Sequence, residues 1–423
     1  MKNIKQDIIF YVVAIIILLI MGEIFFRIYI YNNPDFIVGA NQREIDMKRK
    51  YMWLTNESNL NLNQSAGDAF IHDPILGLRP KPNFHHNIEY FGSYNETHNA
   101  LIKMYITNIN SQGIRKMEEV TKEKDPNLVR IALIGSSFTF GEEAEDRVTF
   151  PGLLQVMTEY TEILNFGMSS AGISYFYLIF KKEVLEYNPD IVIVNIYLDD
   201  IGRDSSDSFK PLIEIGDSGN LSLKNIPFPS NEEFLRDYKQ PLIESYFIKF
   251  LLFRINKLTR DEADSYEYGF ELLDVVLDRM KSDLKDKKLF VTIITPRGYN
   301  PNSELNDYDK LITHPSYLRL KEMLSKKQIT YLDSSQVFGK EFDKYGDDTT
   351  IFYNPQHHFT LLGNTIFAQN IKIMLEKEDL IKKTISYPYF YDRDKDRAVF
   401  FINKDKKTER VIYPYNITKT VEK

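Results

Sequence analysis

The sequence predicts an α/β protein in which a parallel sheet lies between two layers of helices, preceded by an N-terminal transmembrane helix. Three observations predict it. An apolar segment opens the chain, short β-branched runs alternate with helical patterns after residue 126, and loops rich in Gly and Ser follow those runs. Alternation of strands with helices favours a parallel sheet, because parallel neighbours need a crossover between them. The 423 residues suffice for one large domain with additions.

The apolar segment covers residues 8–30 and is almost uninterrupted. About 20 apolar residues span the hydrocarbon core of a bilayer. Glu23 and Arg27 lie four positions apart near its end, where they can pair on one helix face. A cleavable signal peptide is the alternative, but bulky aromatic residues occupy the place of a small-residue cleavage site. We therefore expect a single-pass anchor in residues 1–31 that contacts the lipid bilayer through residues 8–30.

Composition excludes several other functions. The net charge is −7 and no basic cluster is present, which argues against a nucleic-acid partner. The absence of cysteine excludes disulfides, thiolate metal sites and a cysteine nucleophile. The pair His357 and His358 has no accompanying cluster at ligand spacing, and no phosphate-binding glycine loop occurs. We expect neither a metal nor a cofactor.

Four regions follow one another along the chain. After the anchor, residues 32–126 form an irregular region with short strands such as 100–106. The α/β domain occupies residues 127–376 and is interrupted by an insertion at about 204–285, and residues 377–423 form a charged extension with a strand-like run at 398–402. The expected strands of the domain are 129–134, 162–166, 190–197, 289–295 and 329–332. The expected helices are 150–160, 174–186 and 361–375, with 242–257 and 263–284 in the insertion.

The loops that follow the strands carry the candidate chemistry, because ligands of open parallel sheets bind beyond the carboxyl ends of the strands. Taken alone, Ser137 in a Gly-Ser-Ser turn reads as a helix N-cap. A serine leaving a strand, nearby glycines and a late histidine are also what acyl transfer needs: a base to take the hydroxyl proton and N–H groups to hold the oxyanion. The four blocks are GSSFTFGEE (135–143), NFGMSSAG (165–172), YLDDIGRD (197–204) and YNPQHHFTLLGN (353–364).

These blocks, in this order, resemble the SGNH (GDSL-type) hydrolase superfamily, and its membrane-anchored bacterial members most of all. Their first block usually reads GDSFTFGEGV, which this chain matches with Ser136 in place of Asp. Residues 73–83, residues 108–115 and the end of the anchor also resemble that subgroup. The resemblance touches residues 8–370 in pieces and implies a three-layer α/β/α, flavodoxin-like fold.

The resemblance also implies a role for each matching position. Ser137 is the expected nucleophile and its own N–H one oxyanion donor, with Gly167 as the second donor. His358 is the expected general base. Asp199 stands where the family has an Asn that supplies the third donor, and Gln356 stands where the family has the Asp that orients the base.

Two of these positions depart from the family. A charged carboxylate at Asp199 cannot donate a hydrogen bond, and the loss of one such donor costs about 2.7–4 kcal/mol of transition-state stabilisation. Gln356 can orient an imidazole but cannot stabilise the imidazolium by charge, a change that lowers turnover by around 10⁴ in the serine-protease example. Approach of Asp199 or Asp200 to His358 would compensate. Ser136 is expected to shape the turn.

The implied function is an ester hydrolase or O-acyltransferase whose globular part is periplasmic or extracellular, with an acylated small molecule or acylated cell-surface polysaccharide as substrate. The alternative is a catalytically inactive relative that binds a glycan or a membrane partner in cell-envelope assembly. The altered residues Asp199 and Gln356 motivate that second hypothesis.

Overall fold

The structure is a computed structural model whose contacts divide the chain into two units, Met1–Asn61 with Pro229–Asp264 and Leu62–Phe228 with Ser265–Lys423. Each unit is described by itself. The described residues are 2–32, 69–90, 103–204, 210–216, 219–230, 262–295, 315–340, 352–353, 358–383, 389–392, 397–404 and 407–413.

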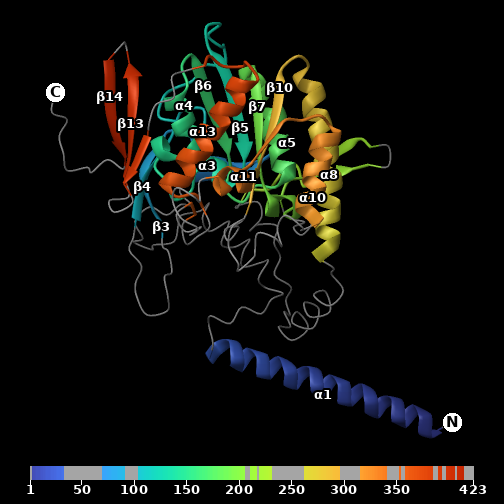
Figure 1. Ribbon diagram of the computed structural model, residues 1–423. Helices are drawn as coiled ribbons and strands as arrows, with labels where there is room; N and C mark the ends of the chain where they lie inside the picture. Colours follow the sequence, from blue (N-terminus) through green and yellow to red (C-terminus); the bar gives the residue numbers. More distant parts are fainter. Residues whose placement is uncertain are drawn as a thin grey trace. The chain divides into compact units, whose positions relative to one another are not determined.

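The first unit contains the helix α1, Lys2–Asn32 (Figure 1). Arg27 Nε lies 2.8 Å from Glu23 Oε1, so the pairing predicted for these two residues is present. Among the helices in the described part of the chain, none combines the length and the apolar character that a bilayer crossing requires. The transmembrane anchor over residues 8–30 therefore stays a prediction. The helix expected over 242–257 lies outside the described residues.

A parallel five-stranded sheet forms the centre of the second unit, in the order β11-β10-β7-β5-β6 (Figure 1). This sheet confirms the α/β class. Its strands match the five predicted runs to within about two residues at each end. They are β5 Val129–Gly135, β6 Thr161–Gly167, β7 Ile191–Tyr197, β10 Lys288–Ile294 and β11 Tyr331–Asp333.

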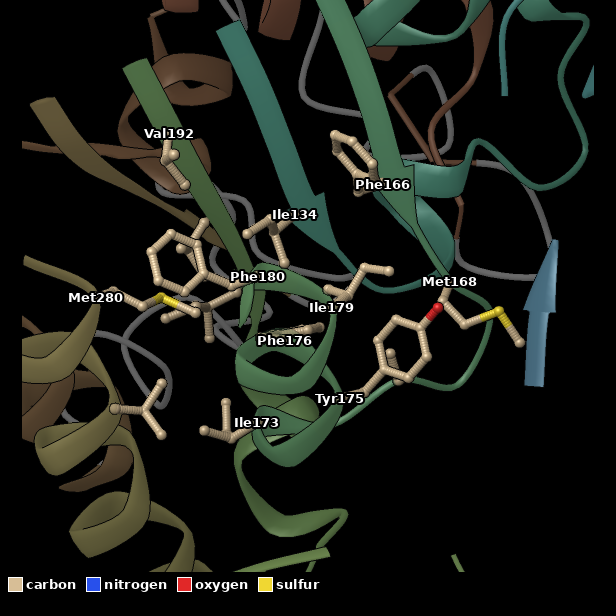
Figure 2. Close-up of a cluster of buried hydrophobic side chains, with 14 of the residues drawn as sticks. Ile134, Phe166, Met168, Ile173, Tyr175, Phe176, Ile179, Phe180, Val192 and Met280 are labelled. Atoms are coloured by element: carbon tan, nitrogen blue, oxygen red, sulfur yellow. The ribbon is translucent and has the colours of Figure 1, made fainter. Parts of the chain in front are cut away.

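Helices cover both faces of this sheet because each strand is apolar on both sides. Along β5, Ile131 and Leu133 join one buried cluster, whereas Ala132 and Ile134 join the other. Figure 2 shows the second cluster, in which Ile134 meets side chains of α5. The helices of that face are α5 Ile173–Lys182, α8 Glu262–Leu284 and α10 Pro315–Lys326; those of the other face are α4 Phe150–Met157, α11 Ser334–Gly339 and α13 Leu361–Lys377.

Two helices differ from the sequence-based expectation and a third matches it. The helix predicted at 150–160 ends at Met157, because the chain turns at Tyr160 (φ +57°) into β6. The helix predicted at 174–186 is α5 followed by a separate 3₁₀ turn, Val184–Tyr187. The helix predicted at 263–284 is present as α8, and it buries Leu272, Val276 and Leu277 in the core cluster on one face of the sheet. Thus α8 is the crossover helix between β7 and β10.

Small antiparallel sheets complete the described residues, and none of them joins the central sheet. The strand-like run predicted at 398–402 lies within β13. The pairs are β1 Phe70–Asp73 with β2 Gly77–Pro80, β3 Phe84–Tyr90 with β4 Lys103–Ile109, β8 Leu212–Ile215 with β9 Leu221–Lys224, and β13 Arg397–Lys404 with both β12 Tyr389–Asp392 and β14 Lys407–Tyr413.

Candidate active site

Ser137 lies at the carboxyl edge of the sheet, where β5 passes directly into the one-turn helix α3, Ser137–Phe140. The turn is tight. A Cβ atom at Gly135 would lie 2.8 Å from the backbone oxygen of Asn195 on the neighbouring strand, so this position requires glycine. The helix ends at Gly141, whose φ of +89° also favours glycine. These two glycines hold the Ser137 side chain at the edge where ligands of such sheets bind.

His358 comes to the same edge from the segment that precedes α13. Its Nε2 lies 2.9 Å from Ser137 Oγ, although the two residues are 221 positions apart in the sequence. The ring packs edge-on against Phe138, with 5.2 Å between centroids. When Nε2 accepts a hydrogen bond from the serine hydroxyl, the neutral ring carries its hydrogen on Nδ1. The structure therefore places a base in hydrogen-bond reach of a serine hydroxyl.

The carboxylates beside His358 are not the ones expected from the sequence. In the described residues, Glu142 Oε2 lies 3.5 Å from Nε2 and Glu143 Oε2 lies 3.5 Å from Nδ1. Among the described residues, neither Asp199 nor Asp200 forms an ion pair with this ring, so the compensation predicted from them is not present. The missed signal is in the first block: the family pattern GDSFTFGEGV has glycine where this chain has Glu143.

Two of the expected oxyanion donors are engaged or displaced. The Gly167 N–H donates to Asn165 Oδ1 at 2.9 Å, so it acts as an oxyanion donor only if that bond is released. Gly167 has a packing role instead, because a Cβ there would lie 2.1 Å from the backbone nitrogen of Phe140. Asp199 is exposed and its Oδ1 accepts a 3.4 Å hydrogen bond from the Tyr266 hydroxyl. Gln356 lies outside the described residues.

Asp200 is fully buried just below the site, at the end of β7. Burial raises the pKa of its carboxyl to about 7, against the opposing effects of Arg203, the Ser136 hydroxyl and the Tyr197 N–H. Arg203 Nη1 lies 2.7 Å from Asp200 Oδ1. Ser136 stands where the family has its own Asp, and it contacts the Asp200 carboxyl from the 3₁₀ turn Leu198–Gly202 that follows β7. Both side chains help to fix the turn before Ser137.

The raised pKa of Asp200 predicts a pH dependence of stability. The folded protein keeps this carboxyl protonated up to about pH 7, whereas an ordinary aspartate ionises near 3.8. Between these values the unfolded chain binds fewer protons, so the free energy of unfolding falls as pH rises from about 4 to 7, by roughly 4 kcal/mol. Asp200→Asn should lack this fall. Urea unfolding at pH 4.5 and 7.5 measures the free energy of unfolding of both proteins. An equal change with pH in the wild type and Asp200→Asn would contradict the prediction.

Arg115 holds the loop that follows α3, and sequence reasoning gave it no role. Its guanidinium is 1% exposed and donates to the backbone oxygens of Phe140 (2.7 Å), Gly141 (2.6 Å) and Ala144 (2.6 Å). Its Nε lies 2.9 Å from Asp146 Oδ1. The loop that carries Glu142 and Glu143 is thus fixed on both sides by one buried cation.

Within the described ranges, no group of three or more His, Asp or Glu side chains is arranged to hold a metal ion.

Comparison with known proteins gives matches among solved structures alone. No family model and no curated protein matches the chain. A GDSL-like lipase from Bacteroides thetaiotaomicron VPI-5482 shares 15% identity over 61% of this chain and 93% of its own, with a TM-score of 0.35. A member of the lipolytic protein G-D-S-L family from Veillonella parvula DSM 2008 shares 12% identity over 59% and 98%, with a TM-score of 0.34.

A mutant of an acetylxylan esterase from Geobacillus stearothermophilus shares 13% identity over 62% of this chain and 100% of its own, with a TM-score of 0.36. By name, these three solved structures are a GDSL-like lipase, a member of the lipolytic protein G-D-S-L family and an acetylxylan esterase.

Proposed function

We propose that the chain is an ester hydrolase or O-acyltransferase in which Ser137 is the nucleophile and His358 the general base. The observation that carries this proposal is the 2.9 Å contact between Ser137 Oγ and His358 Nε2 at the carboxyl edge of the sheet. A serine hydroxyl becomes nucleophilic when such a base takes its proton. A binding protein without turnover would not need that contact.

The reaction follows from the two side chains. Ser137 Oγ attacks the acyl carbonyl while its proton passes to His358 Nε2, and the imidazolium then gives that proton to the departing alcohol oxygen. The resulting acyl-Ser137 ester is attacked by water, which releases the acid, or by an acceptor hydroxyl, which forms a new ester. In both cases His358 Nε2 takes the proton of the attacking group and returns it to Ser137 Oγ.

The charges at the site favour an uncharged ester. Glu142 and Glu143 both lie 3.5 Å from the His358 ring, so an anionic acyl group would approach two carboxylates. An acetyl ester on a neutral carbohydrate avoids this repulsion, and an acylated polysaccharide of the cell envelope is the substrate class we propose. Exposed apolar side chains along α1, including Phe10, Leu18 and Phe25, support attachment of the chain to a lipid bilayer. A substrate in the cell envelope requires the site to be on the outer side of that bilayer, and this is the orientation we propose.

The proposal is tested with the full chain, a fluorophosphonate probe and a chromogenic acetyl ester. We expect the probe to label the wild type and Ser169→Ala, and to leave Ser137→Ala unlabelled. Ser169 is the matched control, since it lies in the loop after β6 at the same edge of the sheet. Fractionation of the same cells should find the full chain in the membrane pellet and a chain without residues 2–32 outside it.

A binding protein without turnover is the second candidate. The engaged Gly167 N–H and the exposed Asp199 favour it, because they leave the backbone N–H of Ser137 as the remaining expected oxyanion donor. In that case neither labelling nor ester turnover is expected from the wild type, and an acetylated polysaccharide would bind equally to wild type and Ser137→Ala.

A further inference from the structure

Glu143 adopts a backbone conformation that favours glycine. Its φ is +60°, in the loop that follows α3. A side chain in this region is disfavoured by contact of its Cβ with the backbone, so such residues persist where the surroundings hold them, and they gather at functional sites. Here the surroundings are visible: Arg115 binds the backbone oxygens of Gly141 and Ala144, on either side of Glu142 and Glu143.

The Glu143 side chain is buried and directed at the imidazole. It is 7% exposed, and its Oε2 lies 3.5 Å from His358 Nδ1. Ser137 Oγ lies 2.9 Å from the other ring nitrogen, Nε2. The ring is therefore placed between a hydroxyl and a carboxylate, each beside a different nitrogen. When Nε2 accepts from Ser137, the hydrogen on Nδ1 is on the side of Glu143.

We propose that Glu143 is the positioning carboxylate of His358, supplied by the nucleophile's own loop. This inference rests on the proposed function. Glu143 holds the ring in the tautomer that has hydrogen on Nδ1, and it stabilises the imidazolium formed when the Ser137 proton passes to Nε2. The carboxylate itself takes no proton, and the proton on Nε2 leaves with the alcohol. A charge at this point replaces what Gln356 cannot supply.

Glu142 is the natural comparison because it has the same charge and lies at the same 3.5 Å from the ring. It faces Nε2, the nitrogen that the Ser137 hydroxyl occupies, and its side chain is 18% exposed. From there it cannot select the tautomer that leaves Nε2 free to accept. Removing the Glu142 charge therefore changes the electrostatic field at the ring by a similar amount without removing the partner of Nδ1.

The test measures kcat and KM for an acetyl ester, and the rate of fluorophosphonate labelling, in the full chain. Glu143→Gln should lower kcat and the labelling rate by about 10²–10⁴-fold with little change in KM, since an amide cannot stabilise the imidazolium. Glu143→Gly should lose activity to a similar degree while its midpoint of thermal unfolding stays equal or rises, because glycine suits φ +60°. Glu143→Asp should recover part of kcat, and Glu142→Gln should lose clearly less than Glu143→Gln.

Two outcomes overturn the proposal while the proposed function stands. In one, Glu143→Gln and Glu143→Gly keep wild-type kcat; in the other, Gln356→Ala loses kcat and Glu143→Gln does not. If the wild type is inert, the role of Glu143 is tested by nitrogen-15 spectra of the histidine rings, in which the His358 signals are identified by their absence from His358→Asn. We expect hydrogen on Nδ1 of His358 in the wild type and a weaker preference in Glu143→Gln. Identical spectra in both proteins refute the role of Glu143, whereas a wild type that is inert in labelling refutes the proposed function.

Discussion

Replacing His358 by alanine is expected to lower the turnover of an activated acetyl ester by at least about 10³-fold, because Ser137 then has no base within reach. His358 Nε2 is the group that the structure places 2.9 Å from the hydroxyl. The KM should change little, since the imidazole acts on the proton in transfer rather than on bound ester. Initial rates at saturating ester measure the effect.

Added imidazole provides the control for that experiment. It should restore part of the turnover of His358→Ala, because the cavity left by the ring adjoins Ser137, and it should restore nothing in Ser137→Ala. His85→Ala is the matched variant: His85 is exposed and bonds to Asn108 Oδ1 at 3.2 Å. If His358→Ala and His85→Ala turn over the ester at the same rate, the acyl-transfer mechanism is wrong. The double variant His358→Ala, Ser137→Ala should be no slower than either single one.

Arg115→Met is expected to lower the free energy of unfolding by about 3–5 kcal/mol, the usual cost of breaking a buried ion pair by removing one partner. The guanidinium is 1% exposed, and without it the Asp146 carboxylate and three backbone oxygens lose their donor. Methionine fills the space but donates nothing. Urea unfolding measures the change, and slower labelling of Ser137 at sub-denaturing urea should accompany it.

Lysine cannot replace this arginine, because one ammonium group does not reach an ion-pair partner and three backbone oxygens in the geometry of the planar fork. We expect Arg115→Lys to recover less than half of the lost stability. Arg147→Met is the control, since Arg147 is exposed and its Nη2 contacts Met117 Sδ at 3.9 Å. Its effect should stay within about 0.5 kcal/mol. Equal losses for Arg115→Met and Arg147→Met would show that the buried network does not hold the loop.

The strands of the sheet were predictable because their signal is local. A strand buried on both faces is apolar at every position, and the runs at 129–134 and 190–197 satisfy that condition without reference to any other segment. Helix ends were less predictable. α5 ends at Lys182 because Glu183 leaves the helical conformation (φ −125°), and α4 ends at Met157 shortly before a turn at Tyr160 with φ +57°. Neither glutamate nor tyrosine is a residue type that marks a helix end.

The packing of α8 could not be predicted for a similar reason. Its helical pattern is visible in the sequence, but its role as a crossover depends on which sheet face its apolar side chains reach. Leu272 and Val276 are buried against the central sheet, a contact with strands far away in the chain.

The class of fold, the edge of the sheet at which the candidate site lies, and Ser137 and His358 as candidates for one site could all be predicted from the sequence. The residues that surround these two side chains could be identified only from the three-dimensional arrangement. Glu142 and Glu143 lie beside the His358 ring, and Asp199 lies at the surface. The Gly167 N–H donates a hydrogen bond to Asn165 Oδ1. The physical reason is that burial of an apolar run can be inferred from the run itself. The partner of a charged side chain depends on which segment lies within a few ångströms of it, and the order of segments along the chain does not show this.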